Sequence, residues 1–214
     1  MEFTIPKLAG AAGIVGASSA GGFGIYKAIS KGDSIKTVIL RSHSLKFHEF
    51  LDAKDPKWSG VKAEYEKSKS LNKPKEAGKV IDKESLPSWC NEAVNSSFID
   101  TEDFKYRYVL EWCYLNTNTL ESQMGLEGKQ LAGEKEASTG TSAWQSTWTD
   151  KYKPDKEKPE WKITGEDDKL NGSDASQGAT ELQKWCVKKL GVFMYSEEAK
   201  QDSKKFFRFC VKDA

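Results

Sequence analysis

The chain has 214 residues, of which 37% are hydrophobic and 30% charged, and its 33 Lys and Arg nearly balance its 32 Asp and Glu. This is enough chain for one ordinary domain or two small ones. The charge balance argues against a nucleic-acid partner, because phosphate binding needs an excess of basic side chains on one face. A mean hydropathy of −0.66 excludes a polytopic membrane protein.

Residues 8–26 form an uncharged segment between Lys7 and Lys27. At 1.5 Å per residue, a helix of this length spans about 28 Å, close to the thickness of one bilayer core. Small residues recur in it at every fourth position, a spacing that lets membrane helices pack closely. The segment therefore predicts an uncleaved single-pass anchor in membrane lipid, with self-association through the anchor as a further expectation.

Three other interpretations of the segment stay open. A cleaved signal peptide would use a small-x-small site at residues 17–19 or 18–20. A phosphate-binding glycine loop would need a third glycine where the sequence has Lys27, and a strand before it. A flexible tail is the third interpretation, since Gly is a poor helix former in water.

The rest of the chain repeats one motif. The sequence Leu-x-x-Trp-Cys occurs twice at an offset of 96, and an aromatic-Cys step follows each copy, at an offset of 97. The matching residues are Leu86, Trp89, Cys90, Trp112 and Cys113 in the first half and Leu182, Trp185, Cys186, Phe209 and Cys210 in the second. The two cysteines of a pair are therefore 23 residues apart in one half and 24 in the other.

Each copy predicts a helical hairpin. After Ser85, a capping residue, apolar positions recur every four residues at Leu86, Cys90 and Val94. Leu182, Cys186 and Leu190 repeat this pattern. The second arms begin near Asp100 and Ser196, followed by acidic residues that suit the positive end of a helix. The apolar face of the first of these arms is expected to contain Phe104, Tyr108, Trp112 and Leu115.

Shorter elements are expected upstream of each hairpin. Residues 42–51 predict a helix, and Trp58, Val61 and Tyr65 predict the buried face of another. In the second half Trp144, Trp148, Tyr152 and Trp161 would take those roles, in an unsettled register, and Pro154 and Pro159 break any long helix. Residues 125–140 and 165–178 predict loops.

The predicted fold class is therefore all-α. It consists of an N-terminal single transmembrane helix within residues 1–29 and two small repeated domains that contain helical hairpins. The first domain takes residues 30–124, and a linker with the second domain takes residues 125–214.

The cysteine pairs are the candidate site. A loop of this length suits a disulfide worth about 3 kcal/mol, and Trp89, Trp112, Trp185 and Phe209 are the expected aromatic core markers beside Cys90, Cys113, Cys186 and Cys210. Buried free thiols are the alternative, because disulfides require export to an oxidising compartment. A four-Cys zinc site would need close pairs such as C-x-x-C, which the sequence lacks.

No catalytic, cofactor-binding or metal-binding residue is expected. His43 and His48 are the only histidines, and they would fall about 140° apart around a helix, too far to share a metal. Adjacent acids such as Glu102 and Asp103 point to different sides of a helix, so they predict caps or a solvated surface rather than an acid–base pair.

The layout resembles the large paralogous families of uncharacterised membrane-anchored proteins in haemotropic mycoplasmas, wall-less bacteria that live on red blood cells. The likeness rests on the glycine- and alanine-rich membrane segment, the two Trp-Cys motifs and the final aromatic-Cys step, where Phe209 stands in place of the usual Trp. The resemblance implies a variable surface protein active in host contact and immune evasion, and it supplies no established activity and no catalytic residue. It also argues against signal cleavage, since the usual leader peptidase is missing from that lineage.

The expected function is that of a non-enzymatic surface protein in the cell membrane, with its C-terminal part outside and a host surface protein as a partner. The alternative is a membrane-tethered adaptor that faces the cytoplasm and has free thiols. Lys27, Lys31, Lys36 and Arg41 follow the anchor, and the positive-inside rule favours that alternative.

Overall fold

The computed structural model describes residues 32–43, 45–69, 72–136, 142–164 and 169–213. These residues belong to one compact unit, Lys31–Ala214. The expected anchor at residues 8–26 lies outside the described residues. None of the helices within the described ranges is long and apolar enough to cross a bilayer.

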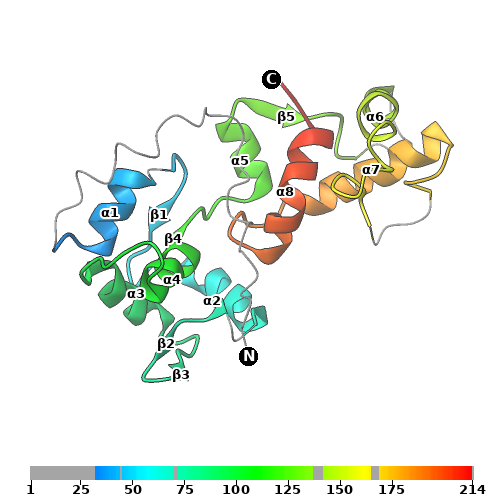
Figure 1. The fold of residues 1–214 in the computed structure, drawn as a ribbon. Coiled ribbons are helices and arrows are strands. Elements are labelled where there is room, and N and C mark those ends of the chain that lie inside the picture. The colour runs from blue at the N-terminus through cyan, green and yellow to red at the C-terminus, as the bar shows by residue number, and fades with distance from the viewer. Residues whose placement is uncertain (1–31, 44, 70–71, 137–141, 165–168, 214) are drawn as a thin grey trace. The chain divides into compact units, whose positions relative to one another are not determined.

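The described residues are mostly helical, with eight α-helices, one π-helix and six short strands (Figure 1). The helices are α1 (Ile35–Ser42), α2 (Trp58–Lys67), α3 (Leu86–Asn95), α4 (Phe104–Trp112), α5 (Leu120–Leu126), α6 (Ser142–Thr147), the π-helix η3 (Trp148–Tyr152), α7 (Ala175–Lys189) and α8 (Glu197–Phe209). The strands are β1 (Glu49–Phe50), β2 (Lys75–Glu76), β3 (Lys79–Val80), β4 (Tyr114–Leu115), β5 (Lys129–Leu131) and β6 (Val211–Asp213). The all-α prediction missed these strands, which pair antiparallel as β1–β4, β2–β3 and β5–β6.

One order of elements occurs twice. Apart from the strands β2 and β3 after α2 and the π-helix η3 after α6, both copies have the same order: a helix, a strand, a helix, the Trp-Cys helix, the aromatic-Cys helix and a closing strand. These are α1-β1-α2-α3-α4-β4 and α5-β5-α6-α7-α8-β6. In both copies the closing strand pairs with the first strand. We call residues 33–115 repeat 1 and residues 118–213 repeat 2. The repeat defined by this order of elements begins at residue 118, whereas the boundary predicted from the sequence lies near residue 125.

Two backbone hydrogen bonds that hold the first helix of each repeat correspond between the repeats. The first residue of α1 or α5 donates its N–H to the loop between the two Cys helices, and a residue of that loop donates back. These bonds are Ile35 to Ser96 at 3.0 Å and Phe98 to Asp33 at 2.8 Å in repeat 1, and Leu120 to Val192 and Met194 to Asn118, both at 2.9 Å, in repeat 2. The bonded loop residues are again 96 positions apart, so the duplication extends to the first helix of each repeat.

Ser34 and Thr119 cap the first helix of each repeat. Ser34 Oγ accepts from the N–H of Thr37 at 3.2 Å, and Thr119 Oγ1 accepts from that of Ser122 at 3.1 Å. Each bond satisfies a donor that the first turn of a helix leaves free.

The sequence leaves open which tryptophans of the two repeats correspond, and the hydrogen bonds of two indoles settle this. The indole N–H of Trp58 donates to Asp52 O at 2.8 Å, and that of Trp144 donates to Glu134 O at 3.0 Å, in both cases just after the first strand. Trp58 therefore corresponds to Trp144, at an offset of 86.

Tyr65 and Tyr152 correspond at an offset of 87, because each packs edge-to-face against the aromatic residue before the second cysteine. The extra residue lies in η3, where the N–H of Lys153 bonds to the carbonyl of Trp148, five residues earlier. A π-turn holds one residue more than an α-turn, and this accounts for the change of offset.

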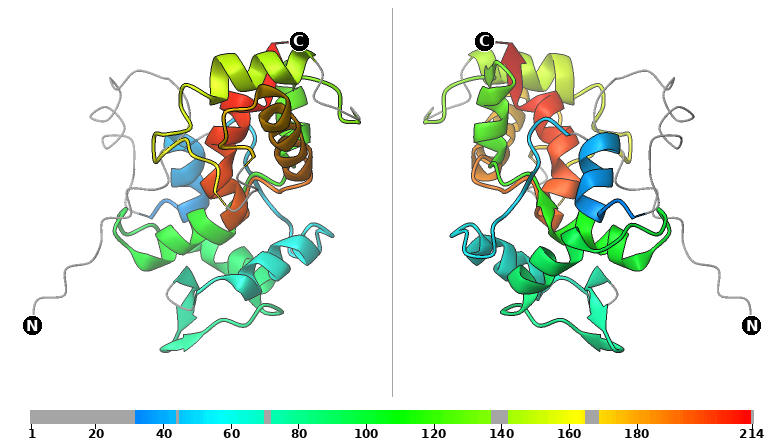
Figure 2. Two further views of the ribbon diagram at one scale, coloured as in Figure 1. Left: turned by 90° about the vertical axis from the view of Figure 1, so that its right-hand side faces the viewer. Right: turned by 90° about the vertical axis from the view of Figure 1, so that its left-hand side faces the viewer.

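The core of repeat 2 is one cluster of buried hydrophobic residues. Helix α8, red in Figure 2, contacts α5, α7 and η3. Leu120 and Met124 of α5 belong to this cluster, together with Trp144, Trp148 and Tyr152. The helix predicted from these three aromatic residues is thus present as α6 and η3. In repeat 1 the predicted face of α2, which contains Trp58, Val61 and Tyr65, is buried as expected.

The helix predicted at residues 42–51 is wrong. The helix ends at Ser42, and residues 49–50 form β1. Ser34 caps an earlier stripe, Ile35, Val38 and Ile39, whose spacing of three and four residues gives a buried helical face.

The predicted apolar face of α4 is confirmed at Trp112, which is buried, and is wrong at Phe104, which is exposed. Besides Trp112, the helix buries Tyr106 and Val109. Asp103, rather than Asp100, caps the helix. Leu115 is buried in β4, beyond the end of the helix.

The two predicted loops contain regular structure. Residues 125–140 include β5, and α7 begins at Ala175, capped by Asp174. Gly178 is therefore helical. A Cβ at this position would overlap with the buried indole of Trp148, so the glycine allows helix and ring to pack closely.

Candidate functional site

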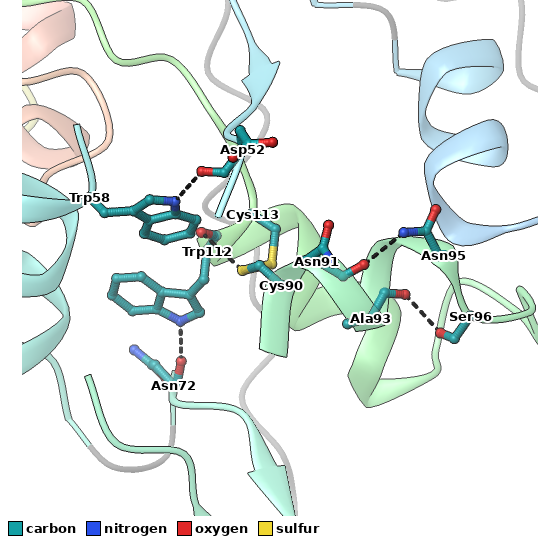
Figure 3. The surroundings of a disulfide bond; sticks show 10 residues. All are labelled: Asp52, Trp58, Asn72, Cys90, Asn91, Ala93, Asn95, Ser96, Trp112 and Cys113. Atoms are coloured by element: carbon teal, nitrogen blue, oxygen red, sulfur yellow. Dashed lines mark hydrogen bonds between the residues drawn. A yellow bond between two sulfur atoms is a disulfide. The ribbon is translucent and has the colours of Figure 1, made fainter. Parts of the chain in front are cut away.

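Each repeat contains one disulfide at the same place. Cys90 of α3 bonds to Cys113 with an S–S distance of 2.07 Å, and Figure 3 shows this bridge. Cys186 of α7 bonds to Cys210 with an S–S distance of 2.01 Å. Both bridges are buried, and none of the described cysteines is a free thiol. The predicted pairs are therefore confirmed as disulfides, and the alternative of buried thiols is not what the structure contains.

The second cysteine of each pair ends its helix. Cys113 and Cys210 are C-cap residues whose N–H groups bond to Val109 O and Phe206 O, at 2.9 and 2.8 Å. The closing strand starts at the next residue. Each disulfide thus fixes both the helical hairpin and the start of the strand that closes the repeat.

Three of the four aromatic markers are buried beside the disulfides: Trp112, Trp185 and Phe209. Trp89 is only half-buried, so the predicted core position does not hold for it. Trp112 donates its indole N–H to Asn72 O at 2.6 Å (Figure 3), a bond that its counterpart Phe209 cannot make.

Two tyrosines that sequence reasoning did not assign to the site complete it. Tyr65 packs against Trp112 with ring centroids 4.8 Å apart, and Tyr152 packs against Phe209 at 5.1 Å. Their sequence offset is 87, which an alignment without a one-residue insertion does not reveal.

Both tyrosine hydroxyls act as neutral structural groups. Tyr65 donates to Ile81 O at 2.5 Å, and burial raises the pKa of Tyr65 to about 12. Tyr152 donates to Asn171 Oδ1 at 2.7 Å and accepts from the N–H of Ile163 at 3.1 Å. Burial also raises the pKa of Tyr152.

The two histidines lie at different ends of a short connection. His43 is the C-cap of α1, with Nδ1 2.9 Å from Ser42 Oγ. His48 precedes β1, its Nδ1 is buried without a hydrogen-bond partner, and burial lowers its pKa. Within the described ranges, no three side chains of His, Cys, Asp or Glu are grouped to hold a metal ion.

A hollow with a volume of about 570 Å³ lies between α2 and the start of α3. Its charged side chains pair with one another, Lys62 with Glu84 at 2.6 Å and Lys83 with Glu66 at 2.9 Å. The hollow is therefore a polar surface on which cations and carboxylates neutralise each other.

The acidic pairs singled out in the sequence serve the surface and the helix ends. Asp103 caps α4, and Glu102 forms an ion pair with Arg107. Glu197 and Glu198 lie in the first turn of α8 and pair with Lys200 and Lys189. The predicted roles as caps and surface charges agree with these contacts.

Comparisons with protein-family models, with curated proteins and with solved structures find no match to this chain.

Proposed function

We propose that the protein is an exported, membrane-anchored surface protein whose two repeats bind or display rather than catalyse. The observation that carries this proposal is the pair of buried disulfides, Cys90–Cys113 and Cys186–Cys210. Disulfides persist in oxidising compartments and are rare where cytosolic reductants act. The folded repeats therefore belong outside the cell, with residues 8–26 as the tether in lipid.

The duplication supports a binding or display role. Two copies of one disulfide-linked scaffold keep the same order of elements while side chains at equivalent positions differ, as Ile99 and Tyr195 do. The family resemblance of the sequence supports contact with a host cell as the purpose of the exposed surface.

A cytoplasm-facing adaptor is the second candidate. Four basic residues, Lys27, Lys31, Lys36 and Arg41, follow the hydrophobic segment, whereas Lys7 alone precedes it. The positive-inside rule then favours a cytoplasmic C-terminal part, although long domains can cross a membrane regardless of charge. In that orientation the four cysteines would be reduced thiols.

Protease treatment of intact cells tests the orientation. The full chain carries an epitope at its C-terminus, and a cytosolic protein serves as the control for intact membranes. The proposal expects loss of the epitope while the control survives. An epitope that disappears only after lysis would establish the adaptor instead.

Host contact is tested separately on the same cells. Cells that display the chain are expected to retain more red blood cells than matched cells without it. Equal retention would contradict the host-contact role and leave the orientation result standing.

A further inference from the structure

A contact inside the chain joins the two repeats. The hydroxyl of Tyr195, in the loop between α7 and α8, lies directly against Gly60 of α2, where a Cβ would overlap with it. Lys200 of α8 forms an ion pair with Glu111 of α4. We call Tyr195 and Lys200 the loop face of repeat 2, and Gly60 and Glu111 the helix face of repeat 1.

Repeat 1 has a loop face of its own. The offset of 96 places Ile99 on Tyr195. Phe104 falls on Lys200 or the next residue, because the offset grows to 97 within this helix. Ile99 and Phe104 are 73% and 67% exposed, more than any other large apolar side chain in the part of the chain that the structure describes. Apolar side chains left in water, at positions that form an interface in the other repeat, indicate a docking surface.

Repeat 2 likewise has a helix face. The Trp58–Trp144 register places Gly60 on Ser146, an exposed small residue of α6, and Glu111 corresponds to Arg208 of α8. The Arg208 side chain is 47% exposed, and its guanidinium lies over the ring of Trp161, 4.6 Å from the centroid. Its Nε bonds to Asp155 Oδ2 at 2.7 Å, and Asp155 also pairs with Lys158. This face therefore combines a cation with an aromatic surface.

The charges of the two remaining faces are complementary. The pair inside the chain joins a cation on the loop face, Lys200, to an acid on the helix face, Glu111. In the other two faces both signs are reversed after their ion pairs are counted. The acids at residues 100, 102 and 103 outnumber Arg107, which pairs with Glu102, and Arg208 and Lys158 outnumber Asp155, which pairs with both. Opposite potentials on two such faces favour their association.

We propose that copies of this chain associate head to tail, with Ile99 and Phe104 of one copy seated on Ser146 and Arg208 of the next. The two faces differ, so the contact is heterologous and builds open rows or closed rings. The inference rests on the internal duplication and holds on either side of the membrane, so it is independent of the proposed function.

Site-specific photocrosslinking of the full chain in its native membrane tests the contact. A benzoylphenylalanine replaces Phe104, and the expected adduct has twice the chain mass and joins residue 104 to residues 142–154 or to the peptide that contains Arg208. The same probe at Val80, which is exposed on β3, is the control and should give no such adduct. An adduct to another region or another protein, or none at residue 104, would overturn the proposal.

Introducing a charged residue into the loop face of repeat 1 distinguishes this contact from association through the anchor, because the anchor is unchanged in the variant. Ile99→Asp is expected to lower the adduct yield from residue 104 about tenfold, as the loss of one central interface residue does. Val80→Asp, an equally polar change elsewhere on the surface, should leave the yield unchanged. A yield that Ile99→Asp does not alter would contradict the proposed interface.

Discussion

Repeat 1 and repeat 2 share their helix caps, strand pairs and disulfides, and they differ in the aromatic residues and the helical turn that pack around these features. Both have the capped first helix, the paired first and last strands and the buried disulfide. Trp112 of repeat 1 is replaced by Phe209, and repeat 2 contains a π-turn that repeat 1 lacks. The difference shows that a few backbone bonds and one disulfide define the module, while its aromatic packing tolerates a changed ring and an inserted residue.

The largest effects are expected from removing the disulfides. Cys90→Ala with Cys113→Ala, and Cys186→Ala with Cys210→Ala, should each lower the free energy of unfolding by about 3 kcal/mol, since the loops have 23 and 24 residues. Urea unfolding of the full chain in detergent measures the loss. Leu126→Ala, at an exposed position, is the control, with a change within about 0.5 kcal/mol. Two very different losses of stability would show that the disulfides do not have the same structural role in the two repeats.

The next largest effect is expected at the glycine beneath the π-turn. Gly178→Ala forces a Cβ against the buried indole of Trp148, and such overpacking costs about 1–3 kcal/mol. This exceeds the gain of up to about 1 kcal/mol from Ala in a helix. Gly125→Ala is the matched control, because its Cβ in α5 would meet nothing and should stabilise the protein. Urea unfolding in which Gly178→Ala also stabilises would contradict the packing of Trp148 on α7.

The equivalent tyrosines should respond unequally to loss of the hydroxyl. Tyr152→Phe leaves the N–H of the buried Ile163 without its bond and should cost about 1–3 kcal/mol, whereas Tyr65→Phe removes a single donor and should cost about 1 kcal/mol. Unfolding curves of the two variants, measured side by side, give the comparison. A larger loss for Tyr65→Phe would refute the assignment of these bonds.

The two capping residues should respond equally. Ser34→Ala and Thr119→Ala each remove one side-chain acceptor at a helix start and should cost about 1 kcal/mol in the free energy of unfolding. The conservative variants Ser34→Asp and Thr119→Asp retain an acceptor and should restore most of the stability. If Asp fails to do so at one position, the helix there does not depend on its cap.

The smallest effect is the pH dependence caused by His48 in repeat 1, which has no counterpart in repeat 2 because repeat 2 contains no histidine. Burial lowers the pKa of His48 below its ordinary value of 6.5, so the unfolded chain binds a proton more readily than the folded one. The stability is therefore fully present above pH 6.5 and falls as the pH is lowered toward the folded pKa. His48→Gln should reduce the loss of stability at low pH, measured by unfolding at a series of pH values. An unchanged loss would mean that other groups cause it.

The sequence predicts the parts of this fold that have strong side-chain patterns. Two Trp-Cys motifs with matched spacing predict the disulfides, and apolar residues every three or four positions predict α2, α3 and α7. Such patterns come from one residue type at a fixed helical period, which a single sequence displays directly.

The remaining parts depend on tertiary contacts. The six strands are two or three residues long, too short for any alternation to be visible. The correspondence of Tyr65 with Tyr152 is hidden by the extra residue of η3, and Gly178 has the composition of a loop until Trp148 packs on it. The sequence predicts that Phe104 of α4 is buried because its side chain is apolar. In the structure this side chain is exposed, and packing within repeat 1 does not bury it.

The most direct test of the duplicated, disulfide-linked module is disulfide mapping of the full chain taken from its native membrane. Free thiols are blocked at lysis, and the protein is digested without reduction for mass spectrometry. We expect two linked peptide pairs, one joining Cys90 to Cys113 and the other Cys186 to Cys210. Four blocked thiols, or a bridge from Cys90 to Cys186 between the repeats, would contradict it.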